Sequence, residues 1–328
     1  MPMRTLSSKA SKEGAFMIKD VRLGNDLEQP CLVRLQKVGT SSNGKAYARG
    51  LLEDNSGTLP FICFEAGPIN RLRTMEGPTP FIIGGRVDAN KYASPMGGQN
   101  LQVIVQKVVP PDGETDLSML LPTGPIDLES LEVEFQTLIG RIQDEPLQRL
   151  VKQVFSGKRY ERFLRNPAGM RLHHAYVGGL LHHTVCVARL ALSMGKTIGG
   201  VDLDLILAGA LLHDIGKLRE ISAGLGFPYT TEGRLMGHIS MGAMLISRIA
   251  ENIPDLSRIR LDELLHIILS HHGDHEKGSP VFCATKEAFI VHYADETDAV
   301  LNQFQTDGKE TWAFNKMLQR FLAVNPLE

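Results

Sequence analysis

An apolar run that ends in a histidine and an aspartate constrains the fold of this chain more than any other feature. Residues 205–212 read LILAGALL, and His213 and Asp214 follow at once. Such a run predicts a buried helix, so its polar end must enter the interior of the protein. Because an unpaired buried charge is costly, groups of this kind normally have a partner or a metal ion. The sequence therefore predicts partners for His213 and Asp214 elsewhere in the chain.

The N-terminal third of the chain has a different pattern, typical of short strands. Segments rich in β-branched and aromatic residues, separated by turn signals, lie at 31–38, 45–53, 58–64, 80–88 and 100–109. A short helix at 66–77 is expected between the third and fourth strands. Five strands with a helix after the third is the order of an OB-fold barrel, a common oligonucleotide-binding module. The alternative is a small barrel that binds nothing.

The remainder of the chain is predicted to be helical. Residues 110–125 contain four prolines and no periodicity, which is typical of a linker. We therefore expect a barrel domain at 1–110, a linker at 111–126 and a second domain at 127–328. The predicted fold class is multi-domain α+β, with a five-stranded OB-fold β-barrel followed by an all-α domain.

Composition and charge limit the class of protein. A hydrophobic content of 43% and a charged content of 22% are those of a soluble globular protein. No apolar stretch approaches the roughly 18 residues of a membrane span. The four cysteines are far apart and form no CxxC pair, which argues against a disulfide framework and favours a reducing cytoplasm. Residues 1–110 carry 14 basic and 9 acidic residues, so a polyanion is a plausible partner of the first domain.

Aromatic residues in the barrel segment are candidate contacts for nucleic-acid bases. Tyr47, Phe64 and Tyr92 could offer stacking faces beside arginine and lysine side chains. Phe61 and Phe81 are further candidates, although some of these five rings must belong to the core.

Helical spacing shows which polar residues of the second domain face inward, because residues three and four apart share a face. His183 shares its face with Leu180, Val187 and Leu190, and His238 with Gly242, Leu245 and Ile249. Asp295 lies on a stripe with Ala288, Val291 and Ala299. His271 and His272 both follow apolar residues, so spacing does not separate them. Several inward imidazoles and carboxylates in one helical domain indicate a first-row divalent metal ion.

This ordered set resembles the HD superfamily of metal-dependent phosphohydrolases. Beyond the ligands, RLHHAYVGGLLHHT (171–184), LLHDIGK (211–217) and ILSHHGD (268–274) resemble the YhaM-type 3′–5′ exoribonucleases. In that family an OB-fold also precedes the HD domain through a short linker, so the resemblance covers nearly the whole chain. One departure is His182, where the family often has glutamate.

The resemblance implies a metal centre with two ions. His183, His213, Asp214 and Asp295 would hold one ion, and His238 with His271 (or His272) the other, bridged by Asp214. Mn²⁺ is the first choice, with Fe²⁺, Co²⁺, Ni²⁺, Zn²⁺ or Mg²⁺ as alternatives. A water activated by the metal ions would attack the phosphodiester.

Five further residues are candidates for contact with substrate. Lys217 shares a face with His213 and Asp214 and could bind a phosphate oxygen or assist the leaving group; otherwise it is a surface lysine at a helix end. His174 could contact substrate or be a packing residue. Arg159, Arg162 and Arg165 lie in the basic segment 152–171, which is either a phosphate track or a solvated helix face.

The predicted function is that of a metal-dependent 3′–5′ exoribonuclease acting on single-stranded RNA, with single-stranded DNA as a second substrate. Cleavage polarity, the preference for RNA and a homo-oligomeric assembly follow from the resemblance alone. The alternatives are an HD-domain hydrolase of small nucleotides and a non-catalytic nucleic-acid-binding protein.

Overall fold

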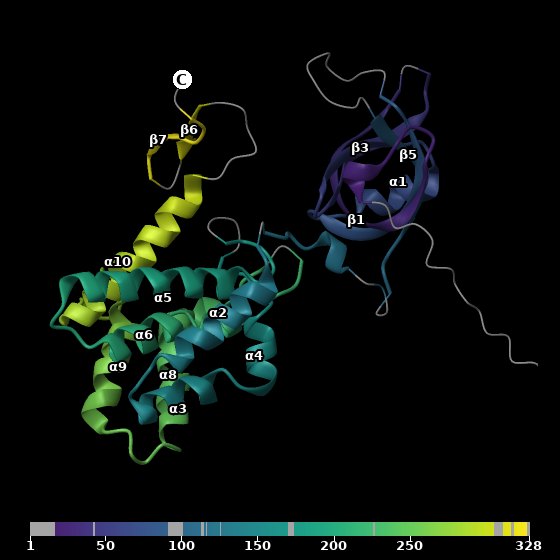
Figure 1. Ribbon diagram of the computed structural model, residues 1–328. Helices are drawn as coiled ribbons and strands as arrows, with labels where there is room; N and C mark the ends of the chain where they lie inside the picture. Colours follow the sequence, from purple (N-terminus) through teal and green to yellow (C-terminus); the bar gives the residue numbers. More distant parts are fainter. Residues whose placement is uncertain are drawn as a thin grey trace, which may run out of the picture. The chain divides into compact units, whose positions relative to one another are not determined.

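The computed structural model consists of two compact units, Met1–Pro122 and Thr123–Glu328 (Figure 1). It describes residues 17–41, 43–90, 101–112, 115, 117–124, 126–169, 174–225, 227–304, 311–315 and 318–326. Each unit has a hydrophobic core of its own. The division between them falls inside the segment 111–126, where we expected a linker.

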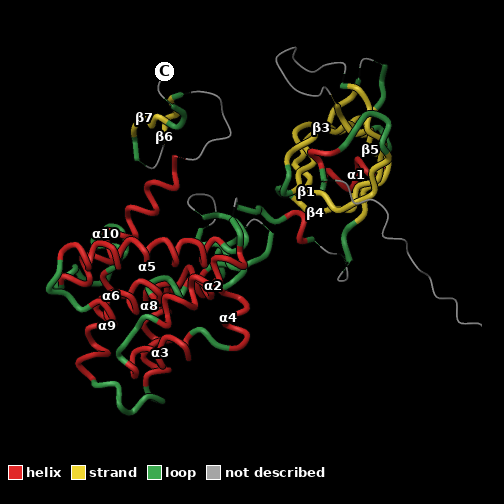
Figure 2. The backbone as a smooth tube through the Cα atoms, in the orientation of Figure 1, coloured by secondary structure: helices red, strands yellow, loops and turns green. Residues whose placement is uncertain are grey.

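The first unit is a closed barrel of five strands in the order β1-β2-β3-β5-β4. All neighbouring pairs are antiparallel except β3 and β5, which are parallel. Figure 2 shows the strands closing into a ring. The elements are β1 (Asp26–Thr40), β2 (Ala46–Asp54), β3 (Gly57–Cys63), α1 (Ala66–Arg73), β4 (Thr79–Ala89) and β5 (Leu101–Val109). The predicted strands and the helix after the third strand are confirmed.

Alternating burial along the strands separates the core of the barrel from its surface. Phe61 and Phe81 point inward and are 2% and 6% exposed, so these two aromatic rings belong to the core. Phe64 is exposed and Tyr47 is half-buried, which leaves both accessible to a ligand. Tyr92 lies outside the described residues.

Part of the proline-rich segment adds to the barrel unit. The short 3₁₀ helix η2 (Ser118–Leu120) contacts β1 and β2, and Leu120 is buried. The backbone N–H of Asn55 donates a hydrogen bond of 2.8 Å to the carbonyl of Met119. Residues around 120 are therefore tied to the barrel.

The second unit is built from helices packed around α6. Its helices are α2 (Leu128–Gly140), α3 (Glu145–Val154), α4 (Gly157–Phe163), α5 (Gly179–Ile198), α6 (Leu203–Leu212), α7 (Lys217–Glu220), α8 (Thr231–Ala250), α9 (Arg258–Ser270) and α10 (Lys286–Leu301). Helix α6 contacts α3, α5, α9 and α10, and every residue from Leu205 to Leu212 is buried. This central position explains why the run is apolar on all sides. None of the described helices combines the length and apolar composition needed to cross a membrane.

The second domain is helical, as predicted, and ends in a short sheet that the sequence did not predict. Strands β6 (Trp312–Asn315) and β7 (Arg320–Ala323) form a two-stranded antiparallel sheet after α10 (Figure 1). Each strand has only four residues. Alternation over so few residues is too short a signal to separate from an irregular segment.

Candidate metal centre

The predicted ligands converge at one end of the apolar helix. His213 and Asp214 follow the last residue of α6, so the end of this helix carries them into the centre of the domain. His183 comes from α5, His238 from α8 and Asp295 from α10. His271 and His272 follow the last residue of α9. Elements distant in sequence thus bring every predicted ligand together.

The two oxygens of Asp214 face different groups of ligands. Oδ2 lies 3.3 Å from His183 Nε2 and 3.4 Å from His213 Nε2. Asp295 Oδ1 completes this first group, 3.1 Å from His183 Nε2. Asp214 Oδ1 lies instead 3.4 Å from His238 Nε2 and 3.7 Å from His271 Nε2. A carboxylate in this position can serve two ligand groups at once.

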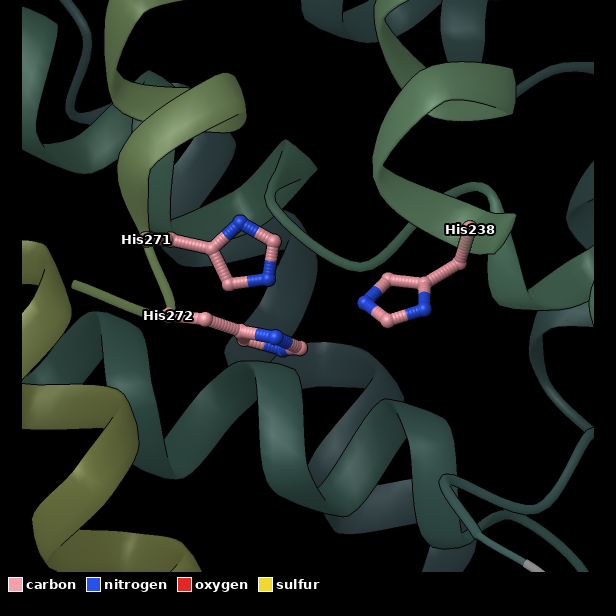
Figure 3. Close-up of side chains that lie close together, drawn as sticks. All are labelled: His238, His271 and His272. Carbon is pink, nitrogen blue, oxygen red and sulfur yellow. The ribbon is translucent and has the colours of Figure 1, made fainter. Parts of the chain in front are cut away.

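Three histidines form the second group of candidate ligands. Figure 3 shows the rings of His238, His271 and His272 facing a common space. One nitrogen of each ring lies within 4.8 Å of the others, a separation that a shared metal ion would allow. Spacing along the chain left open which of His271 and His272 faces inward, and the structure brings both to this group.

In three of these histidines Nδ1 donates a hydrogen bond, which leaves Nε2 as the candidate ligand atom. Backbone carbonyls lie 2.8 Å from Nδ1 of His213, 2.7 Å from that of His271 and 2.8 Å from that of His272. These acceptors require a proton on Nδ1, so the lone pair is on Nε2. A hydrogen bond from the nitrogen that does not bind the metal fixes both the tautomer and the orientation of a metal-binding histidine.

Two carboxylates that the sequence analysis missed hold the other two imidazoles. Asp298 Oδ2 lies 2.7 Å from Nδ1 of His183. Glu220 Oε1 accepts a hydrogen bond of 3.0 Å from the backbone N–H of His238, and Glu220 Oε2 lies 2.9 Å from Nδ1 of the same residue. Asp298 lies three residues after Asp295 on the same helix, and this spacing was the available signal for it.

Unsatisfied polar atoms support the assignment of a metal site. In the described part of the chain, Asp214 Oδ1 and the Nε2 atoms of His238 and His271 are buried without a hydrogen-bond partner. Polar atoms left this way cost folding free energy, and a divalent ion would satisfy them together. The imidazole and carboxylate ligands present therefore fit such an ion.

Lys217 partly compensates the charge of Asp214. Its Nζ lies 2.6 Å from Asp214 Oδ2, and its side chain is buried. This contact is an ion pair between opposite charges. Burial alone would raise the pKa of Asp214, but the positive charge of Lys217 opposes this effect, and the pKa lies well below its usual value. The carboxylate is thus ionised and available as a ligand.

Three other predicted substrate contacts, His174, Arg159 and Arg162, have partners within the protein. His174 is buried, with Tyr176 OH 2.8 Å from Nδ1 and Asp298 Oδ2 2.8 Å from Nε2. The guanidinium of Arg159 bonds the carbonyls of Val154 and Gln153, and that of Arg162 bonds the carbonyl of Leu218. Arg165 is exposed. These bonds give Arg159 and Arg162 structural roles that the sequence did not predict, and they agree with the packing alternative for His174.

Two glycines allow His238 to reach its position. Gly237 has a φ of 69° and breaks α8 just before His238, a conformation that favours glycine. Gly216 packs against the next turn of α8, where an added Cβ would overlap the carbonyl oxygen of His238. The segment after Asp214 and the segment carrying His238 can approach closely only because Gly216 has no side chain.

We expect Gly216→Ala to lower the free energy of unfolding by about 1–3 kcal/mol, since the added methyl group must displace the backbone at His238. Thermal unfolding measures this loss. Gly140→Ala is the matched control, because a Cβ there meets nothing within 4 Å. Equal melting temperatures for the two variants would contradict the close packing at Gly216.

Comparison with known proteins places this geometry in a family. The HD domain family matches residues 180–300, which include the ligands from His183 to Asp295. The chain is 33% identical over 293 residues to a 3′-5′ exoribonuclease YhaM from Listeria innocua, covering 89% of this chain and 91% of that one. It is 32% identical over 283 residues to a 3′-5′ exoribonuclease YhaM from Bacillus velezensis, covering 84% and 86%.

Solved structures give weaker matches. The HD domain of the Listeria monocytogenes phosphodiesterase PgpH matches at 20% identity with a TM-score of 0.31, over 47% of this chain and 77% of that one. We draw nothing from a similarity of this size. The sequence relatives span nearly the full length of both chains, and they show that this chain belongs to the YhaM family of 3′-5′ exoribonucleases, as its motifs predicted.

Proposed function

We propose that this protein is a metal-dependent 3′–5′ exoribonuclease that hydrolyses the phosphodiester bonds of single-stranded RNA. The observation that carries the proposal is the position of Asp214, whose two oxygens face two separate groups of Nε2 atoms. The RNA substrate and the direction of cleavage come from the names of the relatives.

Two groups of residues would hold two divalent ions. The first consists of His183, His213, Asp214 and Asp295, and the second of His238, His271, His272 and the other oxygen of Asp214. When bound, such ions lower the pKa of a water to give a hydroxide nucleophile and neutralise charge on the phosphate. We propose Mn²⁺ first, with Fe²⁺, Co²⁺, Ni²⁺, Zn²⁺ or Mg²⁺ as alternatives.

The residues around the centre prepare it for a phosphodiester. Lys217 keeps its positive charge, because burial lowers its pKa less than Asp214 raises it. Its ammonium is placed to contact a phosphate oxygen or the leaving oxygen once Asp214 is engaged as a ligand. The apolar helix α6 excludes water from one side, which strengthens each electrostatic contact.

The barrel offers a surface suited to a single strand of RNA. Lys37 and Arg49 lie opposite each other on β1 and β2, and both are exposed. Tyr47 is two residues from Arg49 on the same face of β2, and its ring covers Gly39. Phe64, just beyond β3, is 46% exposed. Basic side chains beside aromatic rings bind phosphates and stack bases without sequence preference.

One assay separates this function from its alternatives. The protein is incubated with 5′-labelled RNA, DNA of the same sequence and a panel of nucleotides, in EDTA and in each divalent ion. We expect metal-dependent shortening of the RNA from its 3′ end. Hydrolysis of free nucleotides alone would identify a small-nucleotide hydrolase. Binding of RNA without cleavage in any ion would identify a non-catalytic binding protein.

Changing Arg159, Arg162 and Arg165 to alanine should raise the Kd for RNA if segment 152–171 guides the backbone. Each lost phosphate contact should also reduce the slope of log K against log salt by about 0.7. Salt titrations of RNA binding measure both. Because Arg159 and Arg162 bond backbone carbonyls, Arg165→Ala alone is the control for a loss of folding. An unchanged slope in both variants would show that the segment is a solvated face.

We also propose a cytoplasmic location and a homo-oligomeric assembly. All four cysteines are free thiols, which suits a reducing compartment.

An isolated two-stranded sheet is marginally stable, and Trp312, Phe314 and Phe321 of β6 and β7 are 52%, 49% and 64% exposed. Burial of these rings against another subunit would stabilise the sheet, and light scattering tests the assembly.

A further inference from the structure

Asp298 connects two imidazoles through a single oxygen. Its Oδ2 lies 2.7 Å from Nδ1 of His183 and 2.8 Å from Nε2 of His174. Both rings are buried, at 0% and 1% exposure. A carboxylate oxygen at such distances from a ring nitrogen accepts the proton of that nitrogen. The carboxylate is therefore an acceptor, and both nitrogens that face it must donate.

The same residues continue as a hydrogen-bonded chain on the far side of His174. Tyr176 OH lies 2.8 Å from Nδ1 of His174 and 2.6 Å from Nδ1 of His182. His182 is only half-buried, so the chain begins near the surface. It runs from His182 through Tyr176, His174 and Asp298 to the metal-ligand candidate His183.

One arrangement of protons satisfies every bond in this chain. In its neutral form the ring of His174 carries one proton. That proton is on Nε2, where it reaches Asp298. Nδ1 of His174 must then accept the phenolic proton of Tyr176. The phenolic oxygen in turn accepts the Nδ1 proton of His182.

These three residues also match the spacing of a metal site, since one ligand atom from each of His174, His183 and Asp298 lies within 4.8 Å of the others. The separations of 2.7 and 2.8 Å from Asp298 are, however, those of hydrogen bonds. Protons already satisfy these atoms, so no third ion is needed to explain them.

We propose that Asp298 is a positioning residue, which holds His183 with its proton on Nδ1 and its Nε2 toward Asp214 and Asp295. His174 and Tyr176 orient the carboxylate of Asp298, so His174 supports the metal centre instead of contacting RNA. The inference deepens the proposed function and rests on its metal centre. It assigns a role to three residues beyond the ligand set.

The first test is the affinity of the full-length protein for Mn²⁺, measured by calorimetry without RNA. Asp298→Ala should weaken Mn²⁺ binding by about ten- to a hundredfold, the usual effect of removing a residue that orients a ligand. Asp298→Asn, which keeps an oxygen acceptor, should restore part of the loss. Asp262→Ala is the control, because this carboxylate on α9 is exposed and pairs with Arg258.

The second test is the tautomer of His174, observed by ¹⁵N NMR in the metal-free protein. We expect a proton on Nε2 and none on Nδ1, and a mixture of tautomers in Asp298→Ala. Tyr176→Phe removes only a hydroxyl, so this variant replaces Asp298→Ala in the test if Asp298→Ala does not fold. It should also mix the tautomers, and it should weaken Mn²⁺ binding less than Asp298→Ala does.

The outcomes separate this inference from the proposed function. Wild-type protein that binds no divalent ion would contradict the metal-dependent function. Wild-type protein that binds Mn²⁺ no better than Asp298→Ala would overturn the positioning role alone. A proton on Nδ1 of His174 would also overturn it, whatever the metal affinity.

Discussion

Replacing Asp214 with alanine should reduce RNA hydrolysis by at least about a thousandfold, equivalent to roughly 4 kcal/mol of transition-state stabilisation. Each of its oxygens faces a different group of imidazoles, so the change removes a ligand from both groups. Single-turnover cleavage of labelled RNA measures the loss. RNA binding should be retained, because the barrel surface is not changed.

Metal content gives a second measure of the same change. Wild-type protein saturated with Mn²⁺ should contain two ions per chain, and Asp214→Ala should contain fewer. Asp262→Ala is the control, since this exposed carboxylate on α9 pairs with Arg258 on the same helix. One ion per chain at saturation in the wild type would contradict the two-ion centre. Full activity of Asp214→Ala would contradict the whole site.

Deleting the barrel unit, residues 1–122, should lower the rate on long RNA at least tenfold at subsaturating substrate. The barrel would supply binding energy remote from the reacting bond, and one lost base-stacking contact is worth about 1–3 kcal/mol. Turnover of a chromogenic phosphodiester should change less than about twofold, because the helical unit has its own core. Initial rates on both substrates test this division.

The control for the deletion is a surface variant of the intact chain. Changing Lys37 and Arg49 to alanine should reproduce part of the loss on long RNA without altering the fold, since both side chains are exposed. If the deletion reduces turnover of both substrates equally, the barrel does not act as the RNA-binding part. If the variant with alanine at positions 37 and 49 binds RNA with unchanged affinity, the RNA must bind to another face of the barrel.

The sequence alone determined the features that follow from the regular spacing of side chains along a single strand or helix. Alternation in the N-terminal third located five strands and a helix, and the barrel contains all of them. Stripes at helical spacing selected His183, His238 and Asp295, and each reaches the common centre. A local period suffices because a strand or a helix presents its buried face at fixed intervals along the chain.

Contacts between elements were decided only by the tertiary structure. His183 and Asp298 are 115 residues apart, and their bond depends on how α5 packs against α10. Arg162 likewise bonds the carbonyl of Leu218, 56 residues away, although its basic segment resembles a phosphate track. Both His271 and His272 reach the centre because α9 ends at Ser270, and the helical spacing of side chains no longer applies beyond that residue. Periodicity describes one element at a time, whereas the partners of a buried polar group are set by the packing of several.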